Sequence, residues 1–116
     1  MVQNTLPKAV QDCHNLIVWL MPQLDNFPHN RRFTLGERLE SGLLEMLECL
    51  VEAAYVKNKR DPLKRANMRL AVIQHLWRMA YELQTIPAKR YEQGARLLEE
   101  LGRQVGGWLK SVETPQ

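Results

Sequence analysis

Basic side chains are the residues of this chain whose type and spacing suggest chemistry. Between positions 57 and 69 the only acidic residue is Asp61, and a second basic group lies in the earlier segment FPHNRRF. Lysine and arginine bind nucleic acids mainly by neutralising phosphates, which releases counterions and does not read the base sequence. The pattern therefore predicts a phosphate-binding surface, and the alternative is a set of charges that only keeps the protein soluble. The basic residues of the two groups are Arg31, Arg32, Lys57, Lys59, Arg60, Lys64, Arg65 and Arg69.

Two further features bear on this surface. Tyr55 is the nearest aromatic side chain to residues 57–69 that could stack on a base, so base-specific readout is not predicted. The predicted second helix carries an acidic face, which indicates either a solvated surface or a docking face for a basic partner. Its glutamates are Glu37, Glu45, Glu48 and Glu52.

The sequence contains no arrangement of residues that is typical of an active site. It has no G-x-S-x-G, no glycine-rich phosphate loop and no H-E-x-x-H. His14, His29 and His75 lie in three different segments, and no Glu-x-x-His pair supplies the ligands of a di-iron bundle. We therefore predict a protein that is not an enzyme and that has no catalytic residue, metal site or cofactor.

Length and composition indicate one ordinary globular domain. The 116 residues carry a formal net charge of +3 and suit a single domain over residues 1–116. Cys13 and Cys49 lie among apolar residues without CxxC spacing, which favours buried thiols in a reducing compartment over a disulfide. No signal peptide is visible at the start, and no apolar run approaches the roughly 18 residues of a membrane span. We expect a cytoplasmic protein that does not contact a membrane.

Hydrophobic periodicity predicts four helices. Thr5 is expected to cap the first helix, Thr34 and Glu37 to form a capping box before the second, and Asp61 to cap the third with Pro62 at its first position. Because the connections are short, neighbouring helices should pack antiparallel, so the predicted fold class is all-α, an up-down four-helix bundle. The helices are expected over about 5–26, 34–57, 61–85 and 87–109, followed by a polar tail over 111–116.

The predicted third helix carries two apolar stripes, although an up-down bundle requires one. The first stripe runs from Leu63 to Ala80, and the second lies about 120° around the helix from it. The second stripe indicates either a wide core or a subunit interface, and the spacing leaves both open. Its residues are Met68, Val72, Leu76, Met79 and Leu83. In the predicted fourth helix, Gly102, Gly106 and Gly107 lower the helix propensity, which suggests that a neighbouring helix approaches closely there.

Three segments resemble a known family when they are taken together. The run FPHNRRFTLGERLESGLLEMLECLVEAAY is similar to a signature of the form F-P-R-x-x-R-x-T-L-G followed by a leucine-rich helix that ends in A-x-Y. With LKRANMRLAVIQHLWRMAYEL and YEQGARLLEELGRQVGGWLK, it resembles the Avd-type four-helix-bundle proteins of diversity-generating retroelements over approximately residues 14–110. The resemblance implies a non-catalytic accessory protein that assembles into a homopentameric barrel with a basic surface.

The resemblance also implies partners and site residues. The partners would be the retroelement reverse transcriptase, its template RNA, with DNA as a second candidate, and further copies of the chain, and the complex would support mutagenic cDNA synthesis. The second stripe, Met68, Val72, Leu76, Met79 and Leu83, would then be the oligomer interface. The alternatives are a helical adaptor that binds only protein and the four-helix-bundle proteins encoded in intervening sequences of ribosomal RNA genes. The residues implied to bind nucleic acid are Arg31, Arg32, Lys57, Lys59, Arg60, Lys64, Arg65, Arg69 and Arg78.

Overall fold

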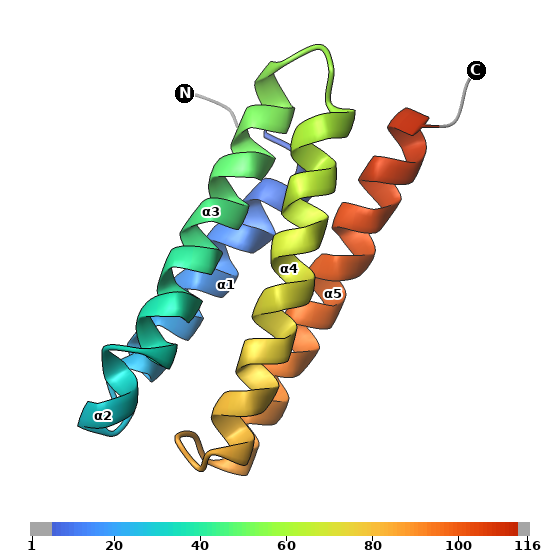
Figure 1. Cartoon of the computed structure of the whole chain (residues 1–116). Coiled ribbons are helices and arrows are strands. Elements are labelled where there is room, and N and C mark those ends of the chain that lie inside the picture. Colours follow the sequence, from blue (N-terminus) through green and yellow to red (C-terminus); the bar gives the residue numbers. More distant parts are fainter. Residues whose placement is uncertain (1–5, 114–116) are drawn as a thin grey trace, which may run out of the picture.

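Four long helices and one short helix make up residues 6–113, which are the residues that the computed structural model describes (Figure 1). No strand occurs within these residues, so the predicted all-helical fold is confirmed, and the long helices form a bundle. The helices are α1 (Lys8–Leu24), α2 (His29–Arg32), α3 (Leu35–Tyr55), α4 (Arg60–Glu82) and α5 (Ala88–Glu113). None of them has the length and apolar character needed to cross a membrane.

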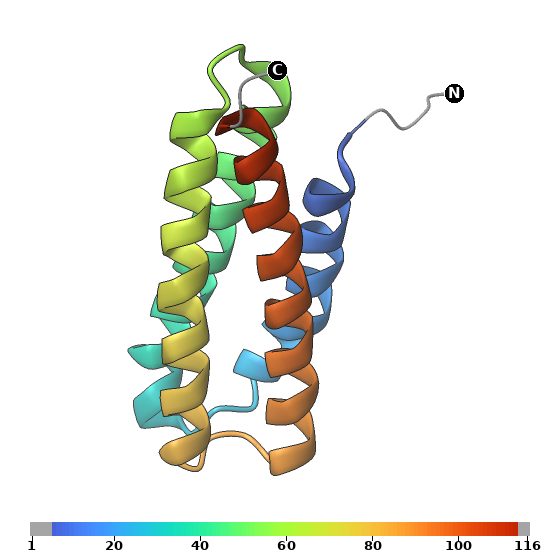
Figure 2. The ribbon, with the colours of Figure 1, turned by 90° about the vertical axis from the view of Figure 1, so that its right-hand side faces the viewer.

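The long helices alternate in direction along the chain (Figures 1 and 2). Around the bundle, α3 packs against α1 and α4, and α5 packs against α4 and α1. The connection between α3 and α4 lies at one end, together with the start of α1 and the end of α5 (Figure 1). The short helix α2 and the connection between α4 and α5 lie at the other end. The two basic groups of the sequence therefore begin at opposite ends of the bundle.

The apolar face predicted for each long helix forms the core. In α4 the first stripe, Leu63, Ala66, Leu70, Ile73, Trp77 and Ala80, is buried throughout. Trp77 is the largest of the fully buried side chains, and its Nε1 donates a hydrogen bond to the carbonyl oxygen of Tyr91 at 3.0 Å. The packing therefore brings α4 into contact with α3 and α5, the helices on both sides of it.

Cys13 and Cys49 are free and buried, and burial raises the pKa of the Cys13 thiol to about 12.

The predicted caps are confirmed only in part: Thr34 is the N-cap residue of α3, but the predicted capping bond is absent, and the cap predicted at Asp61 is wrong. The hydroxyl of Thr34 makes no capping bond to α3, because α2 ends just before it and the hydroxyl donates instead to the carbonyl oxygens of Asn30 and Arg31, at 3.2 and 3.4 Å. Asp61 is not an N-cap, since α4 begins at Arg60. Pro62 still lies in the first turn, where a backbone N–H would have no acceptor within the helix. The predicted cap Thr5 lies outside the described residues.

The ends of the helices differ from the predicted bounds by a few residues. Residues 111–113, expected in a polar tail, continue α5, and residues 114–116 lie outside the described part. The segment 29–32, expected as a loop, forms α2. The close approach of a neighbouring helix, predicted from the glycines of α5, is confirmed at Gly102, where an added Cβ would come within 3.3 Å of Leu70 in α4. The prediction is wrong at Gly106 and Gly107, where nothing within the described chain lies within 4 Å of such a Cβ.

Candidate nucleic-acid interface

The connection between α3 and α4 carries lysines with different roles. The ammonium group of Lys59 donates hydrogen bonds to the carbonyl oxygens of Ala53 and Val56, at 2.8 and 2.9 Å. These carbonyls belong to the last turn of α3 and its C-cap, where a positive charge also complements the helix dipole. Lys57 and Lys64 are exposed and form no ion pair within residues 6–113. Lys59 therefore stabilises the end of α3, while Lys57 and Lys64 keep their charges available.

The arginines in the first half of α4 reach across to the acidic face of α3. The guanidinium group of Arg65 donates to both carboxylate oxygens of Glu52 at 3.1 Å, and Nη1 also lies 3.4 Å from the Cys49 sulfur. Arg69 Nε lies 3.0 Å from Glu45 Oε1. Two predicted nucleic-acid ligands thus pair with two glutamates of the predicted docking face. Exposed pairs of this kind contribute about 0–1 kcal/mol, so a phosphate competes for these arginines at little cost.

Arg60 and Arg78 of the predicted surface also have partners inside the chain. Arg60 pairs with Glu113 at the end of α5, at 3.0 Å, and Arg78 pairs with Glu82 one turn further along α4, at 3.1 Å. The sequence could not foresee the pair between Arg60 and Glu113, because the two residues are 53 positions apart. Of the nine predicted ligands, Arg31, Lys57 and Lys64 are the ones without an ion pair or a side-chain hydrogen bond within residues 6–113.

At the opposite end of the bundle, Arg31 and Arg32 also differ. Arg32 pairs with Asp25 at 3.2 Å and with Glu40 at 3.7 Å, and its guanidinium carbon lies 5.7 Å from the centre of the Phe33 ring. Arg31 lines a cleft of about 520 Å³ between the start of α3 and the end of α4. Phe33, which is 57% exposed, and Arg38 line the same cleft. Phe33 was not among the residues predicted from the sequence, although it directly follows the two arginines and could have been identified by that position.

The second apolar stripe of α4 lies along the groove between α3 and α4. Met68 is 66% exposed, Val72, Met79 and Leu83 are also exposed, and Leu76 is half-buried against the core. The wide-core explanation is therefore wrong for the four exposed residues. Met68 lines one hollow of this groove, of about 400 Å³, and Val72 and Leu76 line another, of about 200 Å³. The role of the stripe as a subunit interface stays a prediction.

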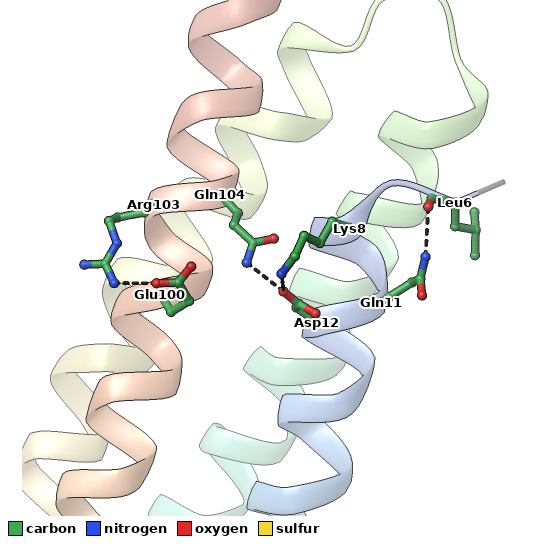
Figure 3. Close-up of polar contacts among 7 residues, drawn as sticks. All are labelled: Leu6, Lys8, Gln11, Asp12, Glu100, Arg103 and Gln104. Carbon is green, nitrogen blue, oxygen red and sulfur yellow. Dashed lines mark hydrogen bonds and ion pairs between the residues drawn. The ribbon is translucent and has the colours of Figure 1, made fainter. Parts of the chain in front are cut away.

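A polar network joins α1 to α5 on the other side of the bundle (Figure 3). The Asp12 carboxylate accepts hydrogen bonds from the Lys8 ammonium group and from the Gln104 side-chain amide, each at 2.6 Å. The bond from Lys8 is the main cause, and the bond from Gln104 the next, of an Asp12 pKa below its ordinary value of 3.8. Arg103 donates to Glu100 on the neighbouring turn of α5. The bond between Asp12 and Gln104 connects α1 to α5, so we assign this network a structural role.

The described residues show no arrangement typical of a metal or nucleophile site. No group of three or more His, Cys, Asp or Glu side chains that could hold a metal ion occurs in residues 6–113. The Cys49 thiol lies beside Arg65, but burial is the largest influence and raises its pKa, so the thiolate is not favoured. The candidate functional surfaces are therefore the basic ends of the bundle and the groove between α3 and α4.

Comparison with known proteins places this arrangement in a family. No curated protein matches the chain. A family model described as bAvd-like matches residues 8–112, which include the four long helices except the last residue of α5, and both basic ends. The match covers nearly the whole chain, so it does not depend on a single motif. The chain therefore belongs to the bAvd-like family, and this membership indicates an Avd-type accessory protein.

Proposed function

We propose that this protein is the non-catalytic accessory subunit of a diversity-generating retroelement. It binds the reverse transcriptase and the template RNA, with DNA as a second candidate, and it supports mutagenic cDNA synthesis. Membership of the bAvd-like family, with a match over residues 8–112, is the observation that carries this proposal. The cations at the two ends of the bundle support a role in nucleic-acid binding.

Phosphate contacts are the proposed mode of nucleic-acid binding. Lys57 and Lys64 form no ion pair in the described part of the chain, so their charges meet a phosphate without first breaking an internal contact. Arg65 and Arg69 line the same hollows as Met68 and Val72, so they join the lysines only where a second copy leaves them uncovered; there, phosphate oxygens replace their exposed glutamates. Charge of this kind gives affinity that falls steeply with salt and does not depend on base sequence.

Self-association is the second part of the proposal. The exposed side chains Met68 and Val72 lie on the groove between α3 and α4, and burying their apolar surface against a second copy would favour assembly. An assembly of five chains, each with a formal charge of +3, carries a total charge of +15 and can attract a nucleic acid more strongly than one chain does. The proposed assembly is the homopentamer that the family resemblance implies.

The experiment is a measurement of solution mass by light scattering at low and high salt, with and without a structured RNA. We expect a mass near five protomers that takes up RNA at low salt and releases it at high salt. A reverse transcriptase produced together with the chain should purify with it. A monomer or dimer that ignores RNA at low salt would contradict both parts of the proposal.

A protein-only adaptor is the second candidate, and one observation favours it. Arg65 and Arg69, which the sequence pattern assigned to phosphates, are paired with Glu52 and Glu45. An oligomer that binds the reverse transcriptase but leaves RNA free at low salt would select this function.

A further inference from the structure

The cleft at the α2 end of the bundle combines an exposed aromatic ring with arginines. Phe33 is 57% exposed, although a phenylalanine side chain has no polar group that would favour contact with water. It lies in the cleft of about 520 Å³ with Arg31 and Arg38. This volume falls in the range of pockets that accept small organic groups.

The surroundings of Phe33 hold its ring in place. The Arg32 guanidinium carbon is 5.7 Å from the ring centre, and the His29 ring meets Phe33 edge-on at 5.3 Å between centres. Arg32 is itself fixed by Asp25 and Glu40. An aromatic side chain that is positioned before binding loses less conformational freedom when a ligand stacks on it.

The charges of the cleft favour an anionic occupant. Arg31 and Arg38 form no ion pair within residues 6–113. Glu37 is the one carboxylate that lines the cleft in this part of the chain, so the lining carries a net positive charge. An apolar protein surface would cover the two guanidinium groups without offering them a partner, which is unfavourable.

We infer that this cleft binds an unpaired nucleotide of a single strand, with its base stacked on Phe33 and its flanking phosphates on Arg31 and Arg38. The inference rests on the proposed function, and it adds that the protein has a site for single strands that is separate from the phosphate contacts of Lys57 and Lys64. Aromatic stacking tolerates any base, because every base has a flat π-face. Single strands therefore bind here without sequence preference, and the paired bases of a duplex do not enter.

The test compares a single-stranded RNA of about 12 nucleotides with the blunt duplex of the same sequence, each measured by fluorescence anisotropy. Phe33→Ala should weaken binding of the single strand about tenfold, the effect of losing one stacked base, and leave duplex binding nearly unchanged. Phe33→Trp should keep single-strand binding, since an indole also stacks. Val18→Ala is the control, because Val18 is an apolar side chain that is 62% exposed on α1 and does not line this cleft; it should change neither affinity.

Several outcomes would overturn the inference. Suppose that the unaltered protein binds RNA and that Phe33→Ala lowers the affinity for the single strand and for the duplex equally, or changes neither affinity. The cleft then has no stacking role, while the proposed function stands. If Phe33→Ala lowers the solution mass and leaves RNA binding intact, the cleft is a contact between copies. If the unaltered protein binds neither RNA at low salt, the proposed nucleic-acid function fails together with the inference.

Discussion

The indole of Trp77 lies directly against the backbone of Gly94. A Cβ atom added at Gly94 would come within 2.7 Å of three atoms of the indole ring, a separation that real Cβ atoms essentially never show. The same indole donates its N–H to the Tyr91 carbonyl, one turn earlier in α5. Trp77 therefore fixes both the separation and the register of α4 and α5, the two helices that follow the basic connection.

Replacing Gly94 by alanine should destabilise the protein by about 1–3 kcal/mol, because the ring would have to move from its packed position and its hydrogen bond. Gly107→Ala is the matched control, since a Cβ there meets nothing within 4 Å in the described chain. Alanine is the better helix former, so this control should stabilise α5 by up to about 1 kcal/mol. Urea unfolding followed by circular dichroism measures both. Equal effects of the two substitutions would mean that Trp77 does not constrain the contact.

The network at Asp12 predicts a dependence of stability on pH. The pKa of Asp12 is lowered by the hydrogen bonds from Lys8 and Gln104, so folding favours the charged carboxylate. This contribution is fully present above the ordinary pKa of 3.8 and is lost as the pH falls through the lower pKa of the folded state. Asp12→Asn should therefore reduce stability near neutral pH, by less than about 1 kcal/mol because the pair is exposed, and the difference should vanish in acid.

Urea midpoints of the unaltered protein and of Asp12→Asn, measured from neutral pH down to acid, check this prediction. Glu92→Gln is the control, because Glu92 is exposed and makes no ion pair within residues 6–113. A difference between Asp12→Asn and the unaltered protein that persists unchanged in acid would show that charge is not the cause.

The periodicity of apolar residues was sufficient to predict the four long helices and their buried faces. Leu63, Leu70 and Trp77 recur at helical spacing, and the core uses this face of α4 as expected. The ends were predicted less well, because capping depends on which groups the preceding backbone places nearby. Thr34 illustrates this, since the unforeseen helix α2 presents carbonyl oxygens to its hydroxyl.

The candidate site was predicted less completely than the fold. Spacing identified Arg65 and Arg69 as basic, and it identified Glu45 and Glu52 as one acidic face. It did not show that the two sets meet, because periodicity fixes which side of a helix is polar but not how two helices are rotated against each other. Phe33 was missed for a similar reason, since its cleft forms only when the end of α4 packs beside α2 and α3.

Lys59 and Lys57 should respond differently to the same substitution. Lys59→Gln removes a charged donor from the carbonyls of Ala53 and Val56 and should lower stability by about 1 kcal/mol. Lys57→Gln removes an exposed charge without an ion pair in the described chain and should leave stability unchanged. Thermal unfolding followed by circular dichroism distinguishes the two. If Lys59→Gln is as stable as the unaltered protein, water replaces the ammonium group at these carbonyls without loss of stability.

Neutralising Lys57 and Lys64 together should weaken RNA binding without affecting the fold. If each lysine neutralises one phosphate of a single strand, the slope of log affinity against log salt should become shallower by about 0.7 for each lysine replaced. Lys89→Gln is the control, because Lys89 is an exposed lysine at the start of α5, outside the predicted surface. Anisotropy titrations at several salt concentrations give the slopes. An unchanged slope in the double variant would exclude these lysines as phosphate ligands.

Met68 offers the cleanest test of the apolar stripe, because it is 66% exposed and contributes little to the core. Met68→Glu should leave the helical spectrum intact but place a charge in the proposed subunit contact, where burial without a partner is costly. We therefore expect the mass measured by light scattering to fall to that of one protomer. Val18→Glu is the matched control, since Val18 is 62% exposed on α1, away from the groove, and it should leave the mass unchanged. If both variants keep the mass of the unaltered protein, the copies do not associate through this stripe; if both lower it, the effect belongs to added charge and not to one surface.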